Sequence, residues 1–308
     1  MSATAISLVA MNGTLPSAHP VTWGVRDLGV SIEGRNVLRG VSLQVRSGEI
    51  VAVVGGDGSG KTTLLRALVG AIATSAGTVE RPPERALGYV SAAPGGYGDL
   101  SVDENLDFAA RAYGVPAAER RARTDALLDR ANLRAARDRL GDQLSGGMRR
   151  KLALAMAVTH QPELLVLDEP STGVDPVGRA ELWRLMTSLA AEGTAIVFST
   201  TYLDEAERAA HVLVLADGRP LLEGTPDALL AAMPGVIGAS DRRPEQGRSW
   251  RDGTGWRTWL ADGPLPNGLD AVRATLEDVV IVAQIALEAT SLKAAKGPGV
   301  AAPSGAQA

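Results

Sequence analysis

A glycine-rich segment directly after an apolar run is the feature that most restricts how this chain can fold. Residues 49–54 read Glu-Ile-Val-Ala-Val-Val, a run typical of a buried parallel strand. The segment that follows consists of Gly55, Gly56, Asp57, Gly58, Ser59, Gly60, Lys61 and Thr62. It has two glycines five residues apart and then lysine and threonine, which is the phosphate-loop pattern. An apolar helix pattern begins immediately afterwards, so this stretch predicts a strand, a loop and a helix in direct succession.

The residue types in this loop suit a phosphate chain. Glycines let successive backbone N–H groups point inward around a β-phosphate, and the helix beginning near Gly60 adds the positive end of its dipole. Lys61 would neutralise charge between the β- and γ-phosphates, while the Thr62 hydroxyl is a hard oxygen ligand suited to Mg²⁺. We include the next residue, Thr63, in the predicted cofactor site. The alternative is a plain glycine-rich turn, but with only four lysines in the chain a chance match in this context is rare.

A second apolar strand ends in two carboxylates. Residues 164–169 read Leu-Leu-Val-Leu-Asp-Glu. Asp168 could reach the coordination shell of Mg²⁺, and Glu169 could orient and deprotonate a water that attacks the γ-phosphate. The pair could also cap the following helix, but its place downstream of a phosphate loop favours chemistry. We therefore predict Glu169 and Asp168 as catalytic residues, and Thr62 and Asp168 as metal ligands.

Strand and helix patterns alternate along the chain. Apolar strand patterns occur at residues 86–91, 164–168, 195–199 and 212–215. Residues 103–133 look helical, with a pause at 114–116. Residues 21–43 alternate between apolar and polar side chains around a turn, which indicates short antiparallel strands. This organisation predicts an α/β fold built on a mainly parallel sheet.

Composition excludes several classes of protein. The chain has 308 residues and no cysteine, which excludes a disulfide scaffold, a thiolate zinc site and a cysteine nucleophile. Its formal net charge of −4 gives no support to nucleic-acid binding driven by gross charge. No apolar run approaches the roughly 18–20 residues of a membrane helix, and the N-terminus does not resemble a secretory signal. We expect a soluble, intracellular protein.

The chain is longer than one α/β domain requires. Residues 1–20 are small and polar, and we interpret them as a disordered leader. A composition break rich in Gly, Pro, Arg and Ser at 233–251 predicts a domain boundary. The predicted division assigns 21–235 to the main domain, 240–293 to a small C-terminal domain ending in a helix, and 294–308 to a disordered tail.

A third motif supplies a second anion site. Leu-Ser-Gly-Gly-Met at 144–148 precedes a predicted helix over 149–158, and Ser145 is a good N-cap followed by N–H groups that could bind an anion. The simpler interpretation is a helix start with a flexible glycine lead. The motif order argues against it: phosphate loop, Leu-Ser-Gly-Gly, carboxylate strand, then Gly-Val-Asp-Pro at 173–176. The residues predicted to bind cofactor here are Ser145, Gly146 and Gly147.

With these motifs in this order, the chain resembles the nucleotide-binding subunits of ATP-binding-cassette (ABC) transporters. The likeness spans roughly residues 25–235 and is closest to the bacterial exporter branch that handles drugs, lipids or polysaccharides. It rests on the motifs at 97–105, 145–151, 173–176 and 202–207. The resemblance implies an α/β ABC ATPase cassette, with a RecA-like parallel-sheet core, an antiparallel β subdomain and a helical subdomain. Some members carry an accessory domain, which would account for a small C-terminal α+β domain.

The resemblance also implies how such a chain would work. It would be an ATPase that binds ATP and Mg²⁺ in a head-to-tail cassette dimer. Nucleotide held by Lys61 and Thr62 of one protomer would be covered by Ser145 and Gly147 of the other. ATP binding would close the dimer and hydrolysis would reopen it, driving a separate membrane permease that residues 97–100 would contact. The chain would lie peripherally on the cytoplasmic face of the cell membrane, with no nucleic-acid partner.

Three positions depart from the family pattern. Ala92 stands where a glutamine normally contacts Mg²⁺ and the attacking water, Thr201 replaces the switch histidine, and Ile32 replaces an aromatic side chain that stacks on adenine. Alanine cannot hydrogen-bond through its side chain, and threonine cannot carry charge. Loss of one well-placed donor to a developing anion costs on the order of 10²–10³ in rate. We expect a site that binds Mg·ATP and hydrolyses it slowly.

Two dimeric arrangements stay open. In a heterodimer, the chain's own site would be degenerate while Ser145–Gly147 completes the active site of a different cassette. In a homodimer, both sites would turn over slowly through Glu169. We favour the heterodimer, because Ser-Thr-Thr-Tyr-Leu-Asp-Glu at 199–205 resembles the histidine-lacking half of exporters with non-equivalent cassettes. The alternatives are a soluble ABC ATPase acting on ribosomes or DNA and a catalytically silent regulatory cassette.

Overall fold

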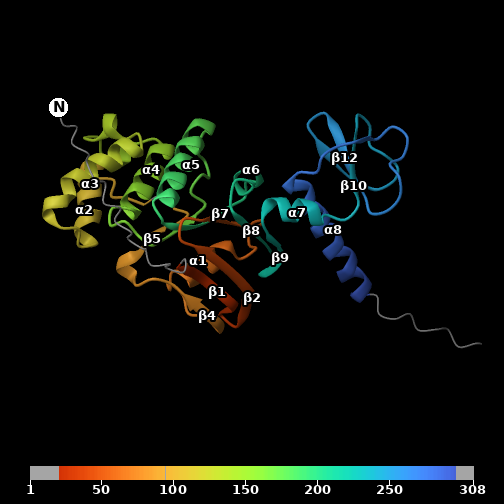
Figure 1. Cartoon of the computed structure of the whole chain (residues 1–308), viewed down its shortest axis with the longest axis horizontal. Coiled ribbons are helices and arrows are strands. Elements are labelled where there is room, and N and C mark those ends of the chain that lie inside the picture. The colour runs from red at the N-terminus through yellow and green to blue at the C-terminus, as the bar shows by residue number, and fades with distance from the viewer. Residues whose placement is uncertain (1–20, 94, 296–308) are drawn as a thin grey trace, which may run out of the picture.

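The computed structural model describes residues 21–93 and 95–295. The predicted leader at 1–20 and residues 296–308 of the predicted tail lie outside these ranges. A helical region lies at one end of the molecule, two sheets occupy the middle, and a smaller unit of strands and one long helix lies at the other end (Figure 1).

The centre of the molecule is a six-stranded sheet. Its strands, in spatial order, are β5 (Leu87–Val90), β6 (Leu164–Asp168), β7 (Ala195–Thr200), β3 (Ile50–Val54), β8 (His211–Ala216) and β9 (Arg219–Gly224). The first five strands are parallel and β9 is antiparallel to β8. The predicted parallel sheet is confirmed, and the predicted strand ends are correct to within one residue.

Every residue of β3, β6 and β7 is buried, because both faces of the sheet are covered. Alternate residues of β3 belong to two different cores. Val51 and Val53 pack with helix α1 (Lys61–Leu68) and the antiparallel sheet, while Ala52 and Val54 pack with the helices of the opposite layer. The period-two alternation of a strand therefore divides one continuous apolar run between two cores.

A second, three-stranded antiparallel sheet lies beside the first. It has the order β2 (Arg35–Arg46), β1 (Thr22–Ile32), β4 (Ala76–Glu80). The turn between β1 and β2 places Glu33 and Gly34 at φ 50° and 76°, a conformation that glycine adopts without strain. Leu28 and Val41 are fully buried between this sheet and α1. The predicted antiparallel strands are confirmed.

The helical region contains three longer helices. They are α2 (Val102–Ala112), α3 (Ala117–Arg130) and α4 (Gly146–Ala157). The predicted break between the first two is confirmed, since Gly114 has φ 74° and Pro116 directly precedes α3. α2 begins with a capping box in which the Ser101 hydroxyl accepts from the backbone N–H of Glu104. α4 begins three residues before the predicted position, because Ser145 caps it.

Three more helices follow strands of the central sheet. They are α5 (Pro176–Ala191), α6 (Leu203–Ala206) and α7 (Pro226–Ala232), with 3₁₀ turns at Glu84–Ala86, Arg134–Ala136 and Gly141–Gln143. α5 and α6 each connect two strands of this sheet, and α7 leads from β9 to the C-terminal unit. α5 and α7 each carry proline in the first turn, after the caps Asp175 and Thr225. Proline is tolerated there because the first N–H groups of a helix have no partner within the helix. Both helices therefore start at a defined residue.

The C-terminal unit combines a small antiparallel sheet with one helix. The sheet has the order β11 (Arg248–Asp252), β12 (Gly255–Leu260), β10 (Val236–Ser240), β13 (Asp270–Ala271), and the helix is α8 (Leu276–Ala295). The α+β class predicted for this unit is confirmed. β10 begins at Val236, before the predicted boundary at 240, and α8 extends over residues 294 and 295 of the predicted tail.

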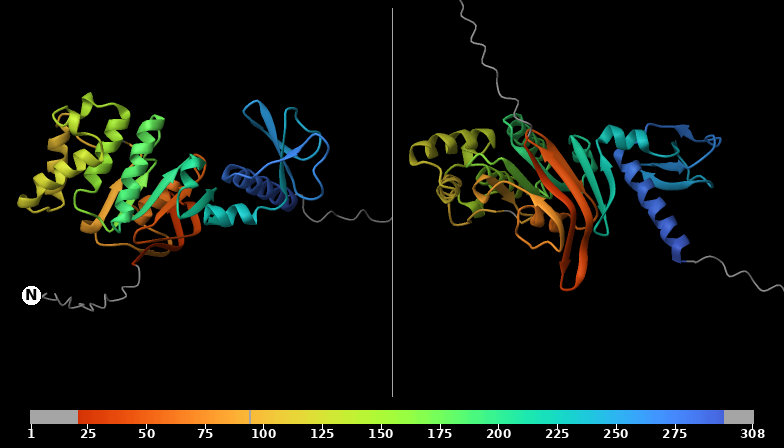
Figure 2. Two further views of the ribbon diagram at one scale, coloured as in Figure 1. Left: turned by 45° about the horizontal axis from the view of Figure 1, so that its top comes forward. Right: turned by 60° about the horizontal axis from the view of Figure 1, so that its bottom comes forward.

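The first turn of α8 joins the C-terminal unit to the rest of the chain. Leu276 is fully buried in the same apolar core as Ala206 of α6, and its backbone N–H donates to Glu207 Oε1 at 3.1 Å. Asp278 accepts from Arg257 of β12 at 2.5 and 2.7 Å. Figure 2 shows the unit on the side of β8 and β9, opposite the helices α2 and α3.

Among the helices of the described ranges, none is long and apolar enough to cross a bilayer.

Candidate functional site

The phosphate loop lies between β3 and α1, as predicted. Gly58 and Gly60 have φ of 78° and 104°, a region that other residues rarely adopt. A Cβ atom on Gly60 would lie 2.6 Å from Leu38 Cδ2, so this turn also requires the absence of a side chain. The exposed tip of the loop includes Asp57, and Thr63 lies half-buried in the first turn of α1. Glycine therefore sets the shape of the loop that leads into α1.

Lys61 joins the loop to the carboxylate strand. Its side chain is 5% exposed, and its ammonium donates to the carbonyls of Gly55 at 2.8 Å and Gly56 at 3.2 Å. The same nitrogen lies 3.5 Å from Glu169 Oε1. The chain thus holds a buried cation directly inside the loop, where a phosphate would need one.

Asp168 is the centre of a buried hydrogen-bond group at the end of β6. Its Oδ1 accepts from Thr62 Oγ1 at 3.2 Å and from Ser199 Oγ at 2.7 Å. Its Oδ2 is buried and has no hydrogen-bond partner among the described residues. A carboxylate oxygen left over beside a threonine hydroxyl is the kind of donor set that Mg²⁺ prefers, so these residues fit the predicted ion. Thr62 and Asp168, predicted as metal ligands, are brought together.

Glu169 directly follows but is held in a different way. Its backbone has φ 50°, and its N–H donates to Ser199 Oγ at 2.9 Å. Its carboxylate lies between Lys61 and the hydroxyl of Thr172, which donates to Oε2 at 3.2 Å. Positive φ in a non-glycine residue is strained and tends to occur at functional sites. The two neighbouring carboxylates therefore point to different partners, one toward a metal position and one toward the phosphate loop.

The signature segment lies at the start of a different helix. Ser145 Oγ accepts from the backbone N–H of Met148 at 3.3 Å, which confirms the predicted N-cap of α4. A Cβ on Gly147 would lie 3.4 Å from Val174 Cγ1, so the start of α4 packs against the turn before α5. Gly146 has open space around it. The site residues are thus distributed between two places, residues 55–63 with 168–169 and residues 145–147.

The three departing positions lie in different parts of the fold. The carbonyl of Ala92 accepts from Arg150 Nη1 at 2.6 Å. Burial lowers the pKa of Arg150, and the charges of Glu169 and Asp168 oppose this shift. Thr201 is exposed directly after β7, and Ile32 is 45% exposed at the end of β1. None of these side chains can replace the glutamine, the switch histidine or the stacking aromatic ring of the family pattern.

The two histidines of the described residues lie away from the switch position. His160 stacks on Tyr113 with ring centres 3.7 Å apart and shares a 3.1 Å hydrogen bond with the Leu87 carbonyl. Burial lowers the pKa of His160. His211 lies 3.5 Å from Glu223 across the β8–β9 pair. No histidine of the described residues takes the place of Thr201.

Two polar residues of the site were missed by the sequence. Ser199 links Asp168 to the backbone of Glu169, and Glu205 binds the hydroxyls of Ser171 and Thr200. The available signal was their position, since Ser199 is the second-last residue of β7, beside the expected switch, and Glu205 lies six residues farther on. Residue type alone did not separate them from ordinary capping residues.

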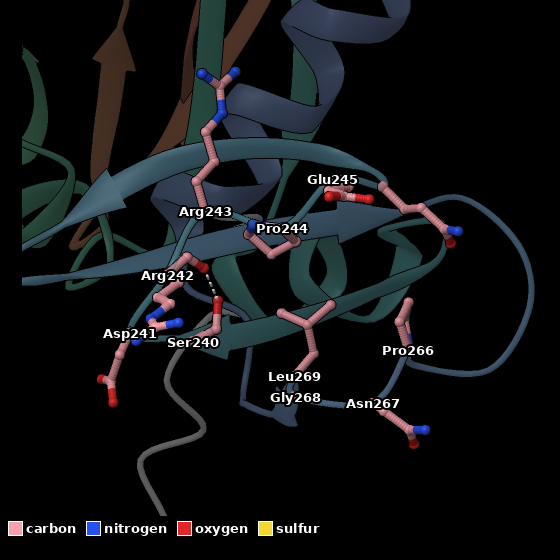
Figure 3. A pocket seen from close by; sticks show the side chains of 11 residues that line it. Ser240, Asp241, Arg242, Arg243, Pro244, Glu245, Pro266, Asn267, Gly268 and Leu269 are labelled. Carbon is pink, nitrogen blue, oxygen red and sulfur yellow. Dashed lines mark hydrogen bonds between the residues drawn. The ribbon is translucent and has the colours of Figure 1, made fainter.

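A separate hollow lies in the C-terminal unit, between residues 240–246 and 266–269 (Figure 3). It has a volume of about 590 Å³. Its walls are mostly exposed side chains, and the Ser240 hydroxyl donates a hydrogen bond to the Arg242 carbonyl at 2.7 Å. It contains none of the residues of the predicted nucleotide motifs.

Comparison with known proteins supports the motif assignment. Residues 38–172 match the family described as ABC transporter. The Nod factor export ATP-binding protein I of Paraburkholderia xenovorans (strain LB400) is 40% identical over 209 residues, covering 64% of this chain and 69% of that protein. The probable multidrug ABC transporter ATP-binding protein YbhF of Escherichia coli (strain K12) is 39% identical over 201 residues, covering 62% of this chain and 35% of that protein.

Solved structures give the same likeness. A structure described as the ATP-binding subunit of an ABC transporter has a TM-score of 0.63 at 30% identity, covering 68% of this chain and 92% of that chain. CbiO1 from Clostridium perfringens, part of the ABC transporter complex CbiONQ, has a TM-score of 0.63 at 28% identity, covering 70% and 92%.

Proposed function

Because this chain belongs to the ABC transporter family as an ATP-binding subunit with ATPase activity, we propose that it serves a bacterial exporter. ATP and Mg²⁺ bind at the interface between two cassettes, and their closure and reopening drive a separate membrane permease. The exporter-type names of the relatives support this choice of branch. The cassette comprises residues 21–235, and residues 240–293 form most of an accessory domain, whose sheet starts at Val236.

The single observation that carries the nucleotide site is the ion pair between buried Lys61 and partly exposed Glu169. The Lys61 side chain is 5% exposed, and its ammonium contacts both a loop carbonyl and the carboxylate of Glu169. A bound triphosphate would pair with the Lys61 ammonium in place of Glu169. The Glu169 carboxylate would then be available to orient a water and accept its proton. Thr62 and Asp168 would hold Mg²⁺, which neutralises phosphate charge when bound. Residues 55–60 contribute backbone N–H groups to the same phosphates.

The chain's own site is slow in this proposal. Ala92 and Thr201 remove two of the side chains that would contact the ion, the water or the γ-phosphate, and Ile32 offers only apolar contact to the base. Residues 145–147 retain the capped helix start that would cover nucleotide on a partner. A heterodimer, in which this signature completes the site of a different cassette, fits that combination better than a homodimer.

Contact with a permease is assigned to the surface near residues 97–100. Tyr97 is 48% exposed, and its ring meets that of Phe108, itself 46% exposed, with centres 4.8 Å apart. Two exposed aromatic rings at one edge of the helical region offer apolar area to a membrane subunit. Such contact would keep the chain peripheral on the cytoplasmic face of the membrane.

The decisive experiment has two arms. In the first, the tagged chain is used to recover membrane subunits from its own organism, and co-purification of a permease is expected. In the second, Mg²⁺-dependent hydrolysis by the purified chain is measured against Glu169→Gln. Weak activity that rises when a second cassette is present supports the heterodimer. Vigorous activity of the chain alone, abolished by Glu169→Gln, would contradict a degenerate site.

A further inference from the structure

Glu205 is a buried carboxylate in the short helix α6, and no sequence motif assigned it a role. It is 8% exposed. Its Oε2 accepts two hydrogen bonds, from Ser171 Oγ at 2.8 Å and from Thr200 Oγ1 at 2.9 Å. Both hydroxyls are buried as well, at 5% and 1% exposure. One carboxylate oxygen therefore joins two segments that are distant in the chain.

Each of the two segments carries a residue of the nucleotide site. Ser171 lies two residues after Glu169, in the loop that follows β6. Thr200 is the last residue of β7 and directly precedes Thr201. The Thr200 hydroxyl also accepts from the backbone N–H of Tyr202 at 3.0 Å, so it is fixed as donor and acceptor at once. Glu205 thereby fixes the backbone on both sides of Thr201.

We propose that Glu205 is a positioning residue that sets the relative placement of the Glu169 loop and the switch segment at 200–202. It acts through Ser171 and Thr200, so that the general base and the residue facing the γ-phosphate move together. The inference rests on the proposed use of Glu169 in hydrolysis.

The alternative is that Glu205 has a purely structural role as the counter-ion of Arg179, which would depend on its negative charge. Arg179 of α5 lies 3.8 Å from Glu205 Oε1 and 3.0 Å from Asp204 Oδ2, and its guanidinium covers the ring of Tyr202 at 4.6 Å. If Glu205 served mainly as a counter-ion for Arg179, the negative charge would matter and the two hydroxyls would not. The two roles can be separated with one isosteric pair of variants.

Glu205→Gln keeps an oxygen that can accept from both hydroxyls but removes the charge, whereas Glu205→Leu keeps similar volume and removes the acceptor. Amide hydrogen exchange of the full chain is followed at residues 169–175 and 200–203, with and without Mg·ATP. We expect both segments to exchange about tenfold faster in Glu205→Leu, the change expected from loss of one to two net hydrogen bonds. Glu205→Gln should stay within about threefold of the unmodified chain.

Single-turnover hydrolysis and ATP binding complete the test. The rate constant should fall about tenfold in Glu205→Leu, while the Kd for ATP stays within twofold, because the phosphate loop is untouched. Ser171→Ala should reproduce part of this loss and add nothing in the Glu205→Leu background. Glu207→Leu is the matched control. It removes a carboxylate at the end of the same helix, but this carboxylate accepts from the backbone N–H of Leu276 and makes no hydrogen bond to residues 200–202.

Equal effects of Glu205→Gln and Glu205→Leu would overturn the proposal in favour of the charge role. So would faster exchange confined to residues 203–207. If the unmodified chain hydrolyses no ATP even in single turnover, the proposed slow site fails, yet the exchange measurement still decides the role of Glu205. If Glu205→Leu does not fold, Ser171→Ala and Thr200→Val must both loosen the opposite segment, or the coupling is refuted.

Discussion

At the residue scale, the adjacent carboxylates of Asp168 and Glu169 contact different partners. Asp168 is 1% exposed and directs one oxygen to Thr62 and Ser199, leaving the other without a partner among the described residues. Glu169 turns away through a φ of 50° and meets Lys61. A strand alternates its side chains between two faces, so neighbours at a strand end naturally point to different partners. The strained backbone at Glu169 completes that separation.

Restoring the missing polar groups should accelerate the chain's own site. In the proposed site, Ala92→Gln combined with Thr201→His would return one donor near the attacking water and one near the γ-phosphate. Each such donor is worth on the order of 10²–10³ in rate at its best, so a gain of at least about tenfold in Mg²⁺-dependent hydrolysis is expected. Hydrolysis under single-turnover conditions measures it, with Glu169→Gln added to the double variant as the control. No gain would mean that the site is limited elsewhere.

Removing the unpartnered oxygen should uncouple ATP binding from Mg²⁺. Asp168→Asn replaces one carboxylate oxygen by an amide nitrogen, which is not a magnesium ligand. The ratio of ATP affinities measured with Mg²⁺ and with a chelator should fall by about tenfold. Ser199→Ala is the control, because it removes a hydrogen bond to Asp168 and leaves both oxygens available. Equal ratios in all three proteins would exclude Asp168 from the ion site.

At the scale of elements, capping side chains fix the starts of two helices beside the predicted signature. Ser145 caps α4 and Asp175 caps α5, and the start of α4 packs against Val174 in the turn just before α5. A capped N-terminus directs free N–H groups outward and favours anions. The sequence located the cap Ser145, since a serine before an apolar periodicity is a recognisable helix start. It placed the start of α4 one turn late, because glycines at its first positions weaken the helix pattern.

The cap of α5 should make stability depend on pH. Asp175 Oδ1 accepts from the N–H groups of Val177 and Gly178 at 3.0 Å, and these bonds, with that of Gly178 foremost, lower the pKa of the carboxyl. A lowered folded-state pKa contributes stability above the unfolded value, and this is lost as pH falls through the folded pKa.

Urea midpoints of the unmodified chain and of Asp175→Asn provide the measurement. Asparagine also caps helices but does not titrate, so the difference between the two proteins should shrink as pH falls below the ordinary range of aspartate. Asp175→Ala should be less stable than both at neutral pH. A difference that does not change with pH would show that the carboxylate charge contributes nothing.

At the scale of the whole molecule, the C-terminal unit is joined to the cassette through α8. Leu276, Val279 and Val280 belong to the main apolar core, while Asp278 on the same turn binds the sheet through Arg257. Asp278 is 1% exposed, and its pairing raises the pKa of Arg257. One helical turn therefore packs in both directions, apolar side chains toward the cassette and a carboxylate toward the sheet.

Breaking that ion pair should loosen the C-terminal sheet and spare the nucleotide site. Arg257→Ala leaves Asp278 buried without its cation, which costs about 3–5 kcal/mol in comparable cases. Residues 236–260 should then become sensitive to limited proteolysis, while ATP affinity stays within twofold. Arg251→Ala is the control, since that arginine stacks on Trp256 from an exposed position. Loss of ATP binding in Arg257→Ala would mean that the two regions are coupled.

Much of the fold was readable because its signals are local. The strand before Gly55, the cap Ser145 and the break at residues 114–116 each depend on residues a few positions apart, and the structure bears them out. The C-terminal strands were harder, since Trp, Arg and Gly alternate there without a clear apolar period. Short strands in a small sheet derive their stability from cross-strand partners that a local pattern does not contain.

The sequence by itself determined the phosphate loop, the carboxylate strand and the signature, because glycine positions and strand–helix transitions are set by backbone sterics and short-range capping. Only the tertiary structure decided which side chains from different segments form hydrogen bonds with one another. Ser199 meets Asp168 across 31 residues and Glu205 meets Ser171 across 34. Those pairs exist because β6 and β7 lie side by side in the sheet, and strand order is a matter of long-range packing rather than of any local pattern.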